Sequence, residues 1–210
     1  MKRSITFYIV LFAIAVIINS SSCGGDDPKI NYEYGFFTSD TVLNLAGMNS
    51  EYDDFNMALP EITMELPIIF SSNRNSSGTE FDIVSGAFGY RFNQIDGSYD
   101  LWSGMIDNSY YSSITSEVNT DGDEFGPLRL FNSLDGMEYL FYAGESENGD
   151  LDLKYMKYFP TGGLNSPLDL DIQEASVLNS LSNDAYITFD WDFEKAYFTS
   201  DRGGDYDILE

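Results

Sequence analysis

The sequence predicts an all-β protein built from a repeated unit, and three observations support this. From about residue 31 onward, short runs rich in Tyr, Phe, Ile and Thr are separated by Gly, Asn, Asp and Ser, as in strands joined by turns. No helical apolar period extends over a long window, so long amphipathic helices are not predicted. One strand-turn-strand pattern also recurs along the chain.

Length and composition fit one folded domain with a hydrophobic core. The chain has 210 residues, of which 43% are hydrophobic and 16% aromatic, which is far too apolar for a disordered acidic segment. Its 10 basic and 35 acidic residues give a net charge of −25 at pH 7, which opposes binding to nucleic-acid phosphates. The chain has no His and one Cys, so a His and Cys zinc site, a Ser-His-Asp triad and an internal disulfide are excluded.

The N-terminal residues predict export. Lys2 and Arg3 form a short basic region, and residues 5–18 carry no charge before a run of small polar residues. This order is typical of a signal peptide. The uncharged stretch is shorter than a helix needs to be to span the ~30 Å hydrocarbon core of a bilayer. We therefore predict a signal peptide over residues 1–22 rather than a permanent membrane helix.

The segment Ser-Ser-Ser-Cys-Gly-Gly-Asp-Asp around Cys23 resembles the lipobox of bacterial lipoproteins, followed by the acidic surface-export signal of the Bacteroidota type. The family usually has Leu where this chain has Ser20. The resemblance implies cleavage between Ser22 and Cys23 and lipidation of Cys23, which anchors the protein to a membrane. An incidental thiol beside an ordinary cleavage site is the alternative. An outer-membrane lipoprotein on the periplasmic or surface side is expected, with a tether over 23–30 and a domain over 31–210.

The repeated unit consists of a strand, a polar turn with Gly and a second strand. It is clearest in residues 68–83 and 196–208. Two further copies are residues 35–40 continuing at 52–55, and residues 139–145 continuing at 151–153. Residues 98–102 look like the second half of a diverged copy.

This unit resembles the TolB-like β-propeller repeat, a WD-repeat-like family in which a strand ends in Phe-x-Ser-Asp-Arg and a Gly-rich turn leads to Asp-Ile. The resemblance is sharp at 68–83 and 186–208. It implies a propeller of about four to five short, diverged blades. The sequence leaves open whether the ring closes within these residues or the last blade is incomplete, as in a piece of a longer protein.

The residues of the repeat are expected to be structural. Short polar side chains are expected to hydrogen-bond the turn backbone, and Gly78, Gly203 and Gly204 to supply positive φ. Arg74 and Arg202 are expected to pair with carboxylates such as those of Asp82 and Asp207. The predicted turn residues are Ser72, Asn73, Arg74, Asp82, Ser200, Asp201, Arg202, Gly203 and Asp207. The predicted blade core contains Phe37, Phe70, Phe141 and Phe198.

Few residues suggest ligand chemistry. Asp121 and Asp123 are a weak candidate for a calcium site, and a solvated acidic turn is the alternative interpretation. No spacing singles out a catalytic pair, so no catalytic residue and no cofactor are predicted. Tyr110, Tyr111, Trp102 and Trp191 would stack on sugar rings if they were exposed.

The predicted function is a non-catalytic binding or scaffolding module for protein or peptide partners, as the TolB-like resemblance implies. A surface glycan-binding lipoprotein is the alternative, followed by a propeller glycoside hydrolase.

Overall fold

The structure is a computed structural model, and it describes residues 42, 44–59, 66–106, 109–159 and 170–210. The chain divides into two compact units: the larger comprises 41–91 and 101–210, and of the smaller the structure describes 92–100. The predicted signal peptide, Cys23, the tether and the repeat copy at 35–40 with Phe37 lie outside the described residues.

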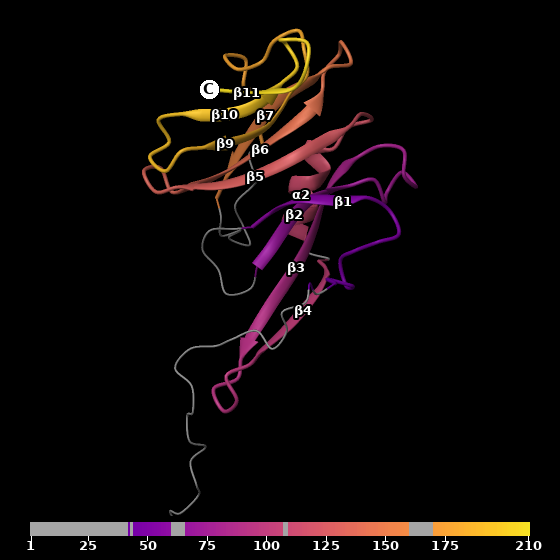
Figure 1. The fold of residues 1–210 in the computed structure, drawn as a ribbon, viewed down its shortest axis with the longest axis vertical. Helices are drawn as coiled ribbons and strands as arrows, with labels where there is room; N and C mark the ends of the chain where they lie inside the picture. The colour runs from indigo at the N-terminus through magenta and orange to yellow at the C-terminus, as the bar shows by residue number, and fades with distance from the viewer. Residues whose placement is uncertain (1–41, 43, 60–65, 107–108, 160–169) are drawn as a thin grey trace, which may run out of the picture. The chain divides into compact units, whose positions relative to one another are not determined.

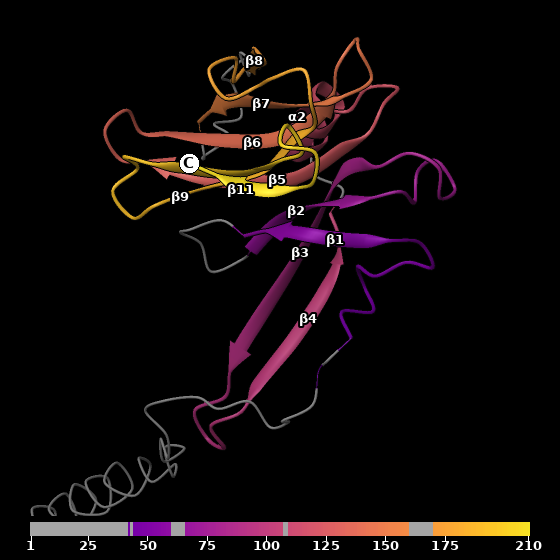
Figure 2. The ribbon, with the colours of Figure 1, turned by 45° about the horizontal axis from the view of Figure 1, so that its top comes forward.

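The described residues form antiparallel sheets, so the predicted all-β class is confirmed (Figures 1 and 2). The first sheet contains β1 (Asp54–Ala58), β2 (Leu66–Ser72), β3 (Asp82–Phe92) and β4 (Tyr99–Met105), in that order. The second contains β5 (Glu124–Asn132), β6 (Met137–Glu145), β7 (Leu151–Tyr158) and β8 (Gln173–Glu174). The third contains β9 (Asp184–Phe189), β10 (Ala196–Ser200) and β11 (Asp207–Leu209). Neighbouring strands are consecutive in sequence, so each sheet is a meander.

About four to five blades are expected from the sequence, whereas the described residues form three separate sheets. None of these sheets closes on itself. A four-stranded antiparallel meander is also the form of a propeller blade, but the ring itself stays a prediction. The expected repeat continuation at 52–55 is wrong, because these residues lead into β1, the first strand of a sheet.

Residues 92–100 of the smaller unit comprise the last residue of β3, the turn over 93–98 and the first two residues of β4. The backbone N–H of Asn93 donates to the carbonyl of Ser98 over 2.9 Å. The carboxylate of Asp96 accepts bonds from the hydroxyl and the N–H of Ser98 over 2.7 and 3.0 Å, and these bonds lower the pKa of Asp96. The segment 98–102, expected to be half of another repeat, belongs to this hairpin and to β4 instead.

Side chains of the second sheet enter two cores, because successive strand residues point to opposite faces. One face packs on the first sheet and on the helix α2 (Ser109–Val118), in a core with Ala58, Ile69, Ile83, Tyr111, Ile114, Val118, Leu140, Tyr142, Met156 and Tyr158. The other packs on the third sheet, in a core with Ala143, Leu153, Ala185, Ile187 and Phe198. The second sheet therefore lies between the other two within the larger unit.

Helix α2 was not predicted. Its residues are mostly Ser, Thr and Tyr, which have modest helix propensity. Tyr111, Ile114 and Val118 nevertheless recur at helical spacing, and all three are buried. The helix is therefore held by packing between sheets rather than by propensity. Among the described residues, no helix is long and apolar enough to cross a membrane.

A buried arginine joins the first sheet, α2 and the second sheet. Arg129 of β5 forms an ion pair with Glu138 of β6, and the side chains of both are at least nine-tenths buried. The guanidinium also donates to the carbonyl of Pro67 over 2.7 Å and lies 5.6 Å from the centre of the Tyr111 ring. This network satisfies a charge whose burial alone would cost several kcal/mol, on the order of the effective penalty for one ion.

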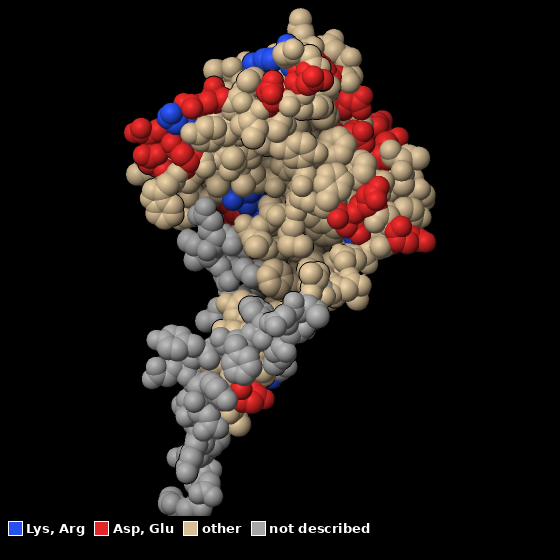
Figure 3. Space-filling view, in the orientation of Figure 1, with Lys and Arg blue, Asp and Glu red and all other residues tan. Residues whose placement is uncertain are grey.

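Acidic residues of the larger unit gather on its turns. The β6–β7 turn carries Glu147 and Asp150, and the β10–β11 turn carries Asp201 and Asp205. Figure 3 shows the carboxylates mainly toward the margins of this unit, while the central part of the same face is mostly uncharged.

Candidate functional site

The first sheet contains a buried Asp-Ser-Arg cluster. Asp54, at the start of β1, accepts a hydrogen bond from the Ser72 hydroxyl over 2.6 Å and pairs with the Arg74 guanidinium over 2.5 Å. Burial by itself would raise the pKa of Asp54, but the bonds from Arg74, Ser72 and Ser50 outweigh it and hold the pKa at about 2. Arg74 also donates to the Ser72 hydroxyl and to the carbonyl of Met48, over 2.9 and 2.6 Å.

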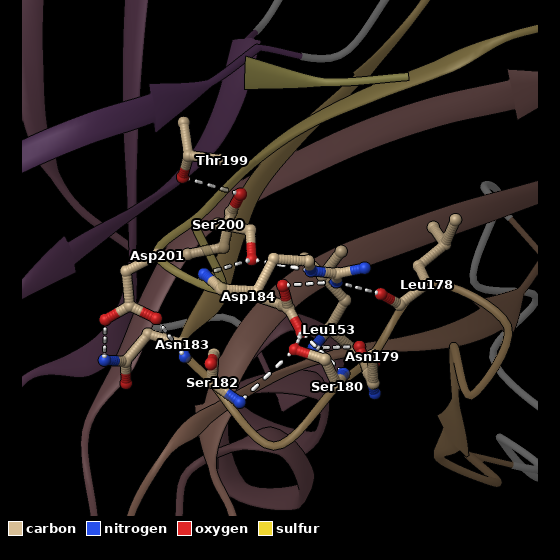
Figure 4. Close-up of polar contacts among 12 residues, drawn as sticks. Leu153, Leu178, Asn179, Ser180, Ser182, Asn183, Asp184, Thr199, Ser200 and Asp201 are labelled. Atoms are coloured by element: carbon tan, nitrogen blue, oxygen red, sulfur yellow. Dashed lines mark hydrogen bonds and ion pairs between the residues drawn. The ribbon is translucent and has the colours of Figure 1, made fainter. Parts of the chain in front are cut away.

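The third sheet repeats this cluster (Figure 4). Arg202 pairs with Asp184 over 2.7 Å and donates to the Ser200 hydroxyl over 2.9 Å and to the Leu178 carbonyl over 2.6 Å. The hydroxyl and the N–H of Ser180 donate to the second oxygen of Asp184. Burial opposes ionisation of Asp184, yet the bonds from Ser200, Arg202 and Ser180 lower its pKa.

The arginines therefore pair with the first strand of their own sheet. The expected partners were Asp82 and Asp207, in the third strand. The carboxylate of Asp82 instead accepts a bond from the Asn75 amide over 2.8 Å. Sequence alone did not reveal this pairing, because Asp54 and Asp184 precede their arginines by a whole hairpin.

The second sheet departs from the pattern. Strand pairing places Gly144 opposite Glu124 and Asp152, as Ser72 lies opposite Asp54 and Asp82. Glu124 thus replaces the aspartate, Gly144 the serine and Ser146 the arginine. One Glu124 oxygen accepts from the N–H and hydroxyl of Thr120 over 3.2 and 2.6 Å, while the other is buried without a partner. Burial raises the pKa of Glu124 to about 7.

The same pairing shows which aromatic residues are equivalent. Phe70 and Phe198 lie two residues before Ser72 and Ser200, and each is 4% exposed. The equivalent residue in the second sheet is Tyr142, which is 2% exposed, and not Phe141 as the expected alignment has it. Phe141 lies on the opposite face, half-buried against the third sheet. A one-residue shift exchanges the two faces of a strand.

The turns use a subset of the expected residues. Gly78 and Gly204 have φ of +95° and +112°, whereas Gly203 is not among the residues with positive φ. The side chains of Asn73 and Asp201 bridge to the residue before β1 and before β9: they accept from the N–H groups of Asp53 and Asn183 over 3.0 and 2.9 Å.

Asp121 and Asp123, the calcium candidates, do not point to a common site. Asp123 accepts a bond from the N–H of Phe81 over 2.8 Å, which ties the first sheet to the second, and Asp121 is exposed. Among the described residues, no group of three or more acidic residues is placed to hold a metal ion.

A motif that sequence reasoning missed joins the sheets. Asn119 lies before β5, and its amide accepts from the N–H and donates to the carbonyl of Ile83 in β3, over 2.8 and 3.0 Å. Asn179, before β9, makes the same two bonds with Leu153 of β7, over 2.9 and 3.0 Å. We call these paired bonds the asparagine bridges. The available signal was an Asn followed directly by Ser or Thr, with Asp or Glu four residues after that hydroxyl residue. It occurs at 49–54, 119–124 and 179–184, but also at 75–80 in the β2–β3 turn, so the pattern alone does not single out the bridges.

A pocket lies on the face of the second sheet that is directed toward the third sheet. Strand pairing sets Tyr139 beside Lys157 and Tyr155 beside Gln173. With Asp171, these residues line a cavity of about 380 Å³, which we call the tyrosine pocket. Such a volume is typical of a small-ligand site.

The polar groups of the tyrosine pocket include both donors and acceptors. The Gln173 amide donates to one oxygen of Asp171 over 2.5 Å, which leaves the amide oxygen directed elsewhere. Lys157 forms no ion pair with any described residue, and its ammonium can donate to a ligand. Tyr139 donates its hydroxyl to Asp135 over 2.7 Å, and this bond raises the pKa of Tyr139.

Aromatic rings form one wall of the pocket. The rings of Tyr139 and Tyr155 lie 6.4 Å apart with 30° between their planes. The centre of the Phe141 ring lies 5.5 Å from that of Tyr155 and 5.1 Å from that of Phe189 in the third sheet. Phe141 therefore packs between Tyr155 and the third sheet. Sequence could show these aromatics at alternate positions, but only strand register brings them together.

The aromatic residues expected to stack on sugars lie elsewhere. Tyr111 of α2 is buried in the core between the first and second sheets, and Tyr110 of the same helix packs against that core and donates to the carbonyl of Phe159. Trp102 and Trp191 are exposed, 51% and 97% respectively. None of the four lines the tyrosine pocket.

Comparisons of the chain with known protein families, with curated proteins and with solved structures found no match.

Proposed function

We propose that this chain is an envelope lipoprotein, anchored through Cys23, whose propeller-like sheets serve as a non-catalytic binding module. The non-catalytic role is supported by the guanidinium, hydroxyl and carboxylate groups of the repeats. These groups bond one another and hold the sheets together, so they are not free to act on a ligand. A glycoside hydrolase needs two carboxylates across its ligand, and Asp171 is the one carboxylate among the described residues that line the tyrosine pocket.

The tyrosine pocket carries the proposal, and its chemistry fits a neutral sugar ring best. Sugar hydroxyls both donate and accept, which matches Lys157 beside Gln173 and Asp171. The C–H faces of a sugar pack well on aromatic rings, and Tyr139 and Tyr155 supply two. The single positive and single negative charge of the lining cancel, while the net charge of −25 disfavours an anionic ligand.

The test is a thermal-shift titration of the full chain in detergent with neutral and uronic-acid oligosaccharides of matched length. A neutral oligosaccharide should raise the melting temperature of the wild type. Tyr155→Ala should weaken binding about 10-fold or more, because a lost ring contact of ~1.4 kcal/mol is tenfold in affinity. Trp191→Ala removes an exposed aromatic outside the pocket and serves as the matched control. Equal binding by the Tyr155 and Trp191 variants, or no shift with any sugar, contradicts the sugar site.

A protein or peptide partner, implied by the TolB-like resemblance, is the second candidate. It is favoured by the β9–β10 turn, where Trp191 is 97% and Phe193 53% exposed, since exposed aromatics are enriched at protein interfaces. The ring of Phe193 lies 6.2 Å from that of Phe189, which continues the aromatic wall of the pocket. A partner whose capture depends on Trp191 and Phe193, without any sugar-dependent shift, would favour this function.

A further inference from the structure

The contact between neighbouring sheets is built from one set of equivalent residues. An asparagine bridge links the strand entry of one sheet to the third strand of the preceding sheet, at Ile83 and at Leu153. Four residues after each asparagine, Asp123 and Asn183 accept the N–H of Phe81 and of Leu151, over 2.8 and 3.1 Å. The side chains of Ile83 and Leu153 lie in the two cores between the sheets, and both residues are 0% exposed.

Among the described residues, no further sheet covers the equivalent strand of the third sheet, β11. Strand pairing sets Asp207 opposite Ser200, as Asp82 lies opposite Ser72, so Ile208 is the equivalent of Ile83 and Leu153. Yet Ile208 is 75% exposed. Tyr206, the equivalent of Phe81 and Leu151, is 56% exposed. Two residues that are apolar in all three sheets thus face solvent here.

The first sheet offers the complementary half. Asn49 and Asp53 are the equivalents of Asn119 and Asp123, and both are exposed. Asn49 donates to the side chain of Asn44 over 2.6 Å rather than bridging to a strand. Beside it lies a hollow of about 80 Å³ lined by Met48, Phe55, Met57 and Phe70 among others, which suits an aliphatic side chain.

We propose that these two faces bind each other between two copies of this chain. Asn49 of one copy bridges to the backbone of Ile208 in the other, Asp53 accepts the N–H of Tyr206, and the Ile208 side chain enters the hollow. The partner is a second copy because each half is made of the residues that already join the sheets inside the chain. Two such head-to-tail contacts join two sets of three sheets into six, within the range of about four to eight blades at which propellers close.

The charge balance of this contact is favourable. The groups at its centre are amide, backbone and apolar groups. The one charge that it buries is the Asp53 carboxylate, which accepts the N–H of Tyr206 as Asp123 accepts that of Phe81. The net charge of −25 on each chain opposes association, and salt screens this repulsion. Pairing should therefore tighten as salt is raised from about 20 to 200 mM.

The test measures the protein mass of the full chain in detergent at 200 mM salt by light scattering. The wild type should have twice the mass of one chain. Ile208→Asp places a charge in the contact without touching any core, and should give single chains. Val177→Asp is the matched control, because Val177 is also an exposed aliphatic residue, at 97%, and should leave the pair intact. Thermal melts of both variants check that they fold.

A second measurement locates the contact. p-Benzoylphenylalanine in place of Ile208 should crosslink, on illumination, to residues 44–57 of a differently tagged copy. Single chains at every concentration, a pair insensitive to Ile208→Asp, an open ladder of larger species, or a crosslink within the same chain would each overturn the proposal. None of these outcomes depends on the tyrosine pocket, so the sugar site stands or falls separately.

Discussion

At the scale of single residues, Glu124 is the exception among three equivalent positions. Asp54 and Asp184 have an arginine partner, whereas Glu124 is buried with one oxygen unpaired. Its pKa is therefore raised to about 7 in the folded chain, while those of Asp54 and Asp184 are lowered. As pH rises, ionisation of Glu124 therefore lowers the stability of the fold, whereas ionisation of Asp54 and Asp184 raises it.

Glu124→Gln tests the first direction. A raised folded pKa means that the folded state holds the proton more tightly, so stability falls as pH rises from the unfolded pKa near 4.5 to about 7 and then levels off. The variant should remove this fall and be more stable than the wild type at pH 8, by up to about 3 kcal/mol. Urea unfolding at pH 5 and pH 8 measures it. The exposed Glu147→Gln serves as control, and equal slopes for the wild type and Glu124→Gln would contradict the assignment.

Asp54→Asn tests the other direction. With a folded pKa of about 2 against 3.8, ionised Asp54 stabilises the fold above pH 4, and this stabilisation is lost as pH falls through about 2. The variant should cost about 2 kcal/mol at pH 7, and the cost should shrink toward pH 2. Acid-to-neutral urea titrations check this, with Asp121→Asn as an exposed control. A cost independent of pH would mean that shape rather than charge matters at Asp54.

At the scale of elements, α2 depends on its buried stripe. Ile114 is 0% exposed, between the first and second sheets. Ile114→Ala should destabilise the chain by about 2–5 kcal/mol, because it removes buried apolar area and leaves a cavity. Glu117→Ala, on the exposed side of the same helix, changes helix propensity in the favourable direction and should cost little. Thermal or urea unfolding compares them, and similar costs for both would show that the helix does not pack as described.

Element order was partly readable from sequence, and the errors have a common cause. Strand and turn chemistry identified β2, β3, β10 and β11 at 68–83 and 196–208. Residues 98–102 and 52–55 were misplaced, because a local pattern does not distinguish the second, third and fourth strands of a meander. The alignment of Phe141 was off by one residue, because the bulge and pairing that set register are formed between strands.

At the scale of the whole molecule, charge is the dominant global property. A net charge of −25 repels itself in the compact state, and salt shortens the reach of this repulsion from about 30 Å at 0.01 M to about 8 Å at 0.15 M. Raising NaCl over this range at pH 7 should raise the melting temperature by several degrees. At pH 4, where many carboxylates are neutral, the increase should be smaller. A melting temperature that falls with NaCl at pH 7 would contradict dominant self-repulsion.

Sequence by itself determined the all-β class, the repetition and the excluded chemistries, because composition, alternation and turn residues are local properties of the chain. The tertiary structure decided the rest. The partners of Arg74 and Arg202, the asparagine bridges and the tyrosine pocket each bring together residues separated by at least one strand. Helix α2 also owes its existence to two sheets that cover its apolar stripe. Such contacts depend on register and on packing between sheets, which no local pattern in one sequence specifies.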